Sequence, residues 1–145
     1  REEGAAVESL QVVAFRLNDS LFATDIMKVR EIMRMTPVTK LPAAPPFMLG
    51  VINVRGKITP VIDTRIKLGV DSKEASEHSR LLLVERNGHP IGLLVDEVTE
   101  VLTIDRDQLE TVDDLGMSVE YAGSIIGVAK LKDRLLTILD TDLLL

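Results

Sequence analysis

The sequence predicts an all-β protein made of two small barrels. About nine or ten short segments have the apolar pattern of strands, and most of them are joined by turns of hairpin length. In addition, one strand–turn–strand pattern occurs twice along the chain. Many short strands at close spacing favour small antiparallel barrels over a sandwich or a parallel sheet. Only short helical turns are expected between the strands.

The clearest hairpin pattern spans residues 50–68. Apolar runs flank the dipeptide Arg55-Gly56, and glycine adopts the positive φ that a tight two-residue turn requires. Gly50, Gly56 and Gly127 are therefore expected to serve backbone geometry rather than binding. Four apolar side chains are expected to share one half-buried face: Ile52, Val54, Ile58 and Ile62.

The same pattern returns at residues 127–145, without a gap, at an offset of 77 positions. Five pairs are identical: Gly50/Gly127, Val51/Val128, Asp63/Asp140, Thr64/Thr141 and Leu68/Leu145. A weaker similarity relates residues 29–33 to 98–102 at an offset of 69. Two amphipathic hairpins also resemble each other by chance, but an internal duplication with two similar β-rich lobes explains the pattern better. Asp63 and Asp140 are then expected to be caps or turn residues.

The rest of the chain is assigned in order. Further strands are expected at residues 10–17, 21–24, 80–86, 90–95 and 98–104, with a closing hairpin in 121–139. Residues 25–35 fit a helix or a strand equally, residues 36–47 form a proline-rich connection, and residues 105–116 resemble an acidic loop. One domain is expected over residues 10–145, with a divide between lobes near 69–79, terminal strands able to cross between lobes, and a disordered segment at 1–9.

Composition excludes several classes of function. The 145 residues contain no cysteine, which excludes disulfides and thiolate chemistry and suits a reducing compartment, and the net charge of −6 disfavours nucleic acid as the main partner. No apolar run approaches the length of a membrane span. No set of residues for catalysis, metal or cofactor binding assembles, so no enzyme is predicted. A sensor or enzyme that uses a groove between the lobes remains the alternative from outside the binding-protein class.

One stretch carries a family resemblance. Asn53-Val54-Arg55-Gly56, followed by Thr59-Pro60-Val61-Ile62-Asp63 and Arg65, resembles the N-L-R-G…P-V-I-D-L-R signature of the CheW-like domains of bacterial chemotaxis. Valine and threonine stand at positions 54 and 64, where the family usually has leucine. The resemblance extends in order from about residue 10 to residue 145.

The resemblance implies two linked five-stranded barrels of SH3-like type and a non-catalytic adaptor. Such an adaptor joins the cytoplasmic tips of chemoreceptors to the regulatory domain of the histidine kinase CheA, in the cytoplasm at receptor arrays. Carried over by motif, Val29 would give apolar contact to the receptor, Glu31 and Arg55 polar contacts, and Asn53 the shape of the hairpin.

Each of these assignments has a structural alternative. Val29 fits a core position, Glu31 a solvated face and Arg55 an ordinary turn. A second alternative concerns the protein: a CheW-like module from a larger chain, either an adaptor of CheV type with a receiver domain or the regulatory domain of CheA.

Overall fold

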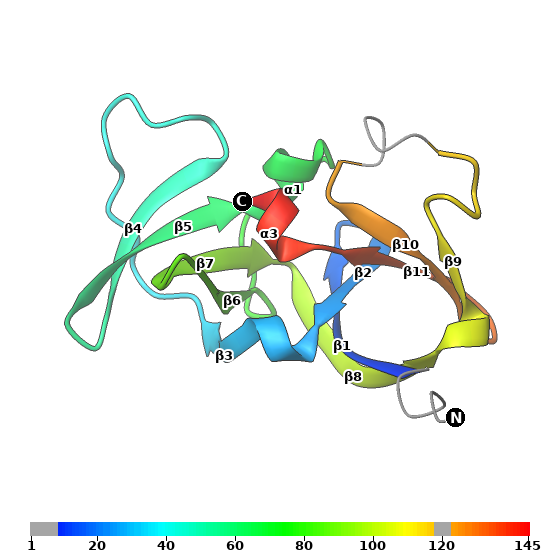
Figure 1. Ribbon diagram of the computed structural model, residues 1–145. Coiled ribbons are helices and arrows are strands. Elements are labelled where there is room, and N and C mark those ends of the chain that lie inside the picture. Colours follow the sequence, from blue (N-terminus) through cyan, green and yellow to red (C-terminus); the bar gives the residue numbers. More distant parts are fainter. Residues whose placement is uncertain (1–8, 118–122) are drawn as a thin grey trace. The chain divides into compact units, whose positions relative to one another are not determined.

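The computed structural model describes residues 9–117 and 123–145, and most of them lie in strands (Figure 1). The strands are β1 (Ser9–Leu17), β2 (Ser20–Asp25), β3 (Val29–Arg34), β4 (Met48–Val54), β5 (Lys57–Asp63), β6 (Arg80–Arg86), β7 (His89–Val95), β8 (Glu97–Asp105), β9 (Leu109–Thr111), β10 (Ile125–Lys130) and β11 (Leu135–Leu139). The helical turns are η2 (Ile26–Lys28), α1 (Thr64–Leu68), η3 (Arg106–Gln108) and α3 (Thr141–Leu144). The all-β expectation is confirmed.

The strands form two sheets, and each sheet belongs mainly to one of two compact units. Among the described residues, unit 1 comprises 9–15, 21–26, 99–117 and 123–145, and unit 2 comprises 16–20 and 27–98. The larger sheet has the order β8-β1-β2-β11-β10-β9, and the smaller one has the order β3-β6-β7-β5-β4. The larger sheet therefore has six strands, one more than expected for a five-stranded lobe.

Strand pairing explains why residues 69–79 lie inside unit 2 instead of dividing the lobes. β6 pairs with β3 and β7 pairs with β5, so the segment after residue 79 returns to the strands that precede residue 64. In the larger sheet the first two strands of the chain, β1 and β2, lie between β8 and β11, which come from its second half. A disordered segment was expected at residues 1–9, but Ser9 begins β1, and residues 1–8 lie outside the described residues.

Each sheet contains a parallel pair, which the expectation of antiparallel barrels did not include. β5 runs parallel to β7, and β2 runs parallel to β11. β5 and β7 are not joined by a tight turn, because α1, a loop and β6 intervene between them. A connection of that length allows the two strands to point the same way.

The two repeated hairpins, β4–β5 and β10–β11, share a bulge at their first strand. The register shifts between Met48 and Gly50 in the first hairpin and between Ile125 and Gly127 in the second. A Cβ atom on Gly50 would lie 2.2 Å from the carbonyl oxygen of Thr39, and one on Gly127 would lie 2.4 Å from a backbone oxygen of β9. Both glycines therefore lie where the lack of a side chain allows the backbone of a neighbouring segment to approach closely. Gly127 has no positive φ, so close approach and not a turn explains it.

The aspartates that end the two hairpins cap the helices that follow them, as expected. Asp63 accepts a hydrogen bond from the backbone N–H of Arg65 in α1, and Asp140 accepts from Asp142 and Leu143 in α3. Such N-caps satisfy donors that a short helix leaves unpaired. No helix among the described residues has the length and hydrophobicity needed to cross a membrane.

The expected shared face of the central hairpin holds for Ile52 and Val54 but not for Ile58 and Ile62. Ile52 and Ile62 are buried and Val54 is half-buried, but the Ile58 side chain is 64% exposed. The register places Ile58 opposite Asn53, whereas Ile52 lies opposite the buried Thr59. Because side chains alternate along a strand, Ile58 then points to the outer face, and Ile62 lies on the same side of β5 as Ile58, although it is buried.

Two segments that the pattern left open or assigned to a loop are resolved by pairing. Residues 25–35 form the 3-10 turn η2 and then β3, which pairs antiparallel with β6. The acidic segment 105–116 contains η3 and the three-residue strand β9, paired with β10. A strand as short as β9 leaves no detectable alternation in the sequence.

Each sheet has its own core. In unit 1 the core residues are Val12, Ala14, Ala23, Ile104, Ala129, Leu136 and Ile138. In unit 2 they are Ile52, Val61, Leu81 and Leu94. The apolar run 81–84 is buried throughout, as its continuous hydrophobicity predicted.

Candidate functional site

The β4–β5 turn projects a charged side chain from a strained backbone. Arg55 and Gly56 have φ values of 49° and 86°, the combination of a type I′ hairpin turn. Positive φ is uncommon for a residue that has a Cβ atom. The side-chain oxygen of Asn53 accepts a hydrogen bond from the N–H of Gly56 at 2.7 Å, so Asn53 holds the turn. The geometry expected for Gly56 is confirmed.

Arg55 and Glu31 form a two-point ion pair. Arg55 Nη2 lies 2.6 Å from Glu31 Oε1, and Nη1 lies 3.3 Å from Oε2, so both carboxylate oxygens accept a hydrogen bond. β3, which carries Glu31, and β4, which leads to Arg55, are the outermost strands of their sheet. The ion pair therefore links the two edges of the sheet of unit 2.

The two charges stabilise each other's ionised form. The hydrogen bond from Arg55 lowers the pKa of Glu31 below its ordinary value, and the same bond raises the pKa of Arg55. The Arg55 side chain is 70% exposed and the Glu31 side chain 38% exposed. Exposed ion pairs contribute little to stability, so this pair is better suited to recognition than to holding the fold.

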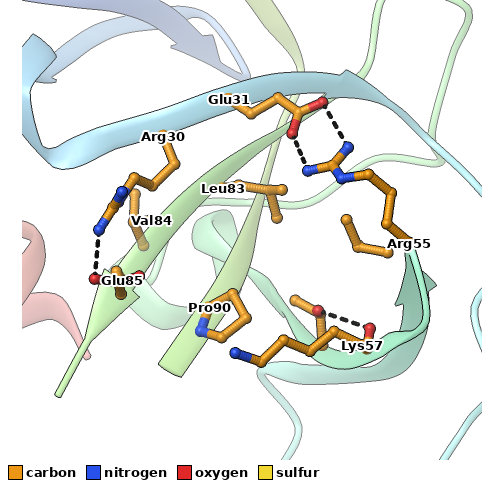
Figure 2. Close-up of a pocket in the computed structure, with 10 residues that line it drawn as sticks. Arg30, Glu31, Arg55, Lys57, Leu83, Val84, Glu85 and Pro90 are labelled. Carbon is orange, nitrogen blue, oxygen red and sulfur yellow. Dashed lines mark hydrogen bonds and ion pairs between the residues drawn. The ribbon is translucent and has the colours of Figure 1, made fainter. Parts of the chain in front are cut away.

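A pocket of about 350 Å³ opens beside this ion pair, entirely within unit 2 (Figure 2). Its lining combines apolar and charged side chains. The lining residues are Arg30, Glu31, Val54, Arg55, Lys57, Thr59, Leu83, Val84, Glu85 and Pro90. A second ion pair, Arg30 Nη2 to Glu85 Oε1 at 2.7 Å, lies at another part of its rim.

The structure brings three of the four predicted site residues to the same end of unit 2. Glu31, Asn53 and Arg55 meet around the β4–β5 turn. Val29 is half-buried, lies opposite Val84, and is separated from Glu31 by a register shift in β3. It is absent from the pocket lining, so its predicted contact with a receptor stays a prediction.

The profile of the CheW-like domain matches residues 11–145 of the chain. The chain belongs to the CheW-like domain family. This membership gives the chain a scaffold role in chemotaxis signalling. The Asn53-to-Arg65 signature that suggested the family builds the turn described above and the helix α1.

Curated and solved relatives of the CheW-like family cover most of the chain. The chemotaxis protein CheW of Rhizobium meliloti is 33% identical over 132 residues, which are 91% of this chain and 84% of that protein. CheW of Bacillus subtilis is 30% identical over 93% of this chain and 86% of its own length. The crystal structure of the scaffolding protein TtCheW from Thermoanaerobacter tengcongensis matches with a TM-score of 0.81 and 35% identity, over 90% of this chain and 88% of that chain.

Sequence reasoning did not single out several residues of the pocket. Arg30, Lys57, Glu85 and Pro90 come from β3, β5, β6 and β7. One signal was available: Glu85 and Pro90 flank the Asn-Gly turn of a hairpin at paired positions. The meeting of β3 with this hairpin depends on long-range pairing, which has no local signal.

Arg65 of the family signature lies in a buried network of hydrogen bonds. Its guanidinium donates hydrogen bonds to both carboxylate oxygens of Asp63 at 2.9 Å, to Asp96 at 2.6 Å and to the carbonyl oxygen of Lys73 at 2.8 Å. The side chain is only 3% exposed. The hydrogen bonds to Asp63 are the main cause of the raised pKa of Arg65.

Proposed function

We propose that this chain is a non-catalytic adaptor that couples the cytoplasmic tips of chemoreceptors to the histidine kinase CheA. It works in the cytoplasm at receptor arrays, binds the regulatory domain of CheA, and needs no cofactor. Family membership supports the general role. The observation that carries the receptor site is the Glu31–Arg55 ion pair at the rim of an apolar pocket.

The chemistry of the pocket suits a helical hairpin as partner. An apolar lining receives side chains from one face of a helix, and charges at the rim fix the register of docking. Two exposed apolar residues stand next to the rim in sequence, Ile32 (44% exposed) after Glu31 and Ile58 (64% exposed) after Lys57, but alternation along a strand turns both away from the pocket. Both lie on the strands that carry the charged rim. Val29, the first residue of β3, contributes apolar contact to the receptor hairpin.

Binding of the chain to two separate fragments tests this function. One fragment is a chemoreceptor cytoplasmic hairpin and the other is a CheA regulatory domain. Arg55→Glu reverses the charge at an exposed turn, so the fold is expected to survive. The matched control is Arg16→Glu, which breaks another exposed ion pair of unit 2, Arg16 with Glu97 at 3.1 Å.

We expect Arg55→Glu to weaken binding of the receptor hairpin at least about tenfold, because the reversed charge at position 55 repels the group of the hairpin that the arginine attracts. Binding of the kinase domain is expected to be unchanged. Arg16→Glu is expected to bind both fragments as the wild type does. Equal binding of the hairpin by wild type and Arg55→Glu would place the receptor site elsewhere. Failure of the wild-type chain to bind either fragment would reject the adaptor function.

A further inference from the structure

The charges around the pocket do not balance. Arg30, Arg55 and Lys57 are cationic, whereas only Glu31 and Glu85 are anionic. Arg55 pairs with Glu31 and Arg30 pairs with Glu85, but Lys57 has no ion pair with any residue that the structure describes. The chain as a whole carries a net charge of −6, so this local positive excess runs against its composition.

The unpaired amine lies at the mouth of an apolar space. Figure 2 shows the Lys57 side chain extended toward Pro90, away from the Glu31–Arg55 pair. Its backbone is fixed, since its carbonyl oxygen accepts a hydrogen bond from the hydroxyl of Thr59 at 3.2 Å. Val54, Leu83 and Val84 supply the apolar lining. A group that enters the pocket therefore meets apolar surface and one available cation.

The duplicated hairpin, β10–β11, also carries a cation without an ion pair in the part of the chain that the structure describes, but there the paired cation is the second of the two. At the offset of 77, Lys132 corresponds to Arg55 and Arg134 corresponds to Lys57. In unit 1 the second cation makes the ion pair, because Arg134 Nη2 lies 2.7 Å from Glu100 Oε2. Lys132 is exposed and has no ion pair among the described residues. Each hairpin tip thus keeps one lysine that its local glutamate does not neutralise.

We propose that the pocket accepts an apolar side chain of the receptor hairpin and that Lys57 recognises a carboxylate next to it. This inference rests on the proposed function, since it names the chemistry of the partner at the same site. On a helix, residues three or four positions apart share one face, so an apolar residue and an acidic residue at that spacing reach the pocket and Lys57 together. Lys57 is then a specificity-determining residue.

The single unpaired cation of the described lining favours a carboxylate over a purely apolar group as the part of the partner that faces Lys57. A purely apolar partner would bury part of the lysine without pairing it, which costs free energy. A partner with a basic residue at this point would be repelled, because no unpaired anion of the lining faces it. The pocket therefore selects acidic over basic hairpins of otherwise equal shape.

The test is the affinity of the receptor cytoplasmic hairpin for a series of lysine variants. Lys57→Gln removes the charge, and we expect about threefold weaker binding, the scale of one exposed ion pair. Lys57→Glu reverses the charge, and we expect at least about tenfold weaker binding. Lys132→Glu makes the same change in net charge at the unpaired lysine of the duplicated hairpin in unit 1, and we expect binding within about twofold of wild type.

A charge-reversal series on the partner identifies the carboxylate. Each acidic residue of the hairpin is changed singly to lysine, and we expect one such change to restore binding to Lys57→Glu while weakening binding to the wild type. If Lys57→Glu and Lys132→Glu weaken binding equally, or if no partner variant restores it, recognition by Lys57 is rejected.

The outcome for the proposed function is separate. If the wild type binds and Arg55→Glu does not, but Lys57→Glu binds as the wild type, the adaptor function stands and only the inference on Lys57 fails. If the wild-type chain does not bind the hairpin, the proposed function fails and the inference fails with it. Circular dichroism of each variant checks that the fold is retained.

Discussion

Replacing Arg65 with leucine is expected to lower the free energy of unfolding by about 3–5 kcal/mol. The guanidinium is bound by Asp63, whose side chain is 3% exposed, and by Asp96, whose side chain is 19% exposed. Leucine fills much of the same space but leaves two carboxylates without their counter-charge. Removing one partner of a buried ion pair is costly because the remaining charge stays desolvated.

Lysine at the same position tests geometry rather than charge. The arginine binds Asp63 through two parallel hydrogen bonds and reaches Asp96 and the Lys73 carbonyl with a third nitrogen. An ammonium group does not reproduce this planar arrangement. We expect Arg65→Lys to lose about 1.5–3 kcal/mol, less than leucine, because the cation is retained.

Urea unfolding followed by circular dichroism measures these losses. With a slope of about 2 kcal/mol per molar urea, Arg65→Leu is expected to lower the midpoint by about 2 M. The control, Arg16→Leu, removes an arginine from an ion pair whose side chains are 46% and 40% exposed, and it is expected to cost less than about 1 kcal/mol. A loss for Arg65→Leu no larger than that of the control would refute the reasoning.

A double variant separates the unpaired charge from the lost packing. Asp63→Asn removes one of the two stranded carboxylates and keeps a side-chain oxygen able to cap α1. We expect Arg65→Leu with Asp63→Asn to be more stable than Arg65→Leu alone. If the double variant is no more stable, unpaired charge is not the cause of the loss.

Three further predictions concern backbone approach, pH and packing. Gly50→Ala is expected to cost at least about 2 kcal/mol, because its Cβ atom would lie 2.2 Å from a carbonyl oxygen, and urea unfolding with an unchanged midpoint would contradict this. The folded-state pKa of Glu31 is lowered, so the stability from its pair with Arg55 is present above the unfolded-state pKa and is lost as pH falls through the folded-state pKa. A carbon-13 NMR titration of Glu31 should therefore show a lower midpoint in wild type than in Arg55→Gln, and equal midpoints would argue against the ion pair. Leu136→Ala removes a fully buried core side chain and is expected to cost about 2–5 kcal/mol, whereas Leu135→Ala, at a position 63% exposed, should change stability little; equal losses would place the core differently.

Local patterns were sufficient to predict the hairpin at the centre of the site. Gly56 and the apolar runs beside it predicted a tight turn, and Asp63 was expected to cap or end the strand. These features depend on residues close in sequence, so a single chain contains the information. The exposed side of Ile58 was predicted wrongly, since the face that a residue occupies depends on the register with the opposite strand.

The charged rim of the pocket could be predicted only in part. Glu31 and Arg55 were singled out through the family signature, but no local pattern showed that they meet. Arg30, Lys57 and Glu85 were missed, because their proximity depends on the pairing of β3 with β6 and of β5 with β7. The electrostatic excess at Lys57 is a property of the assembled sheet.

The amino-acid sequence by itself determined the strand-rich class, the repeated hairpin, the capping aspartates and the lack of cysteine chemistry. The tertiary structure decided which strands share a sheet, including the parallel pairs β5–β7 and β2–β11. It also decided which arginine of the signature is buried in an ion-pair network and which one is exposed at a turn, Arg65 and Arg55 respectively. The physical reason is that alternation and turn chemistry act over a few residues, whereas strand order, burial and charge pairing depend on contacts between segments far apart in the chain.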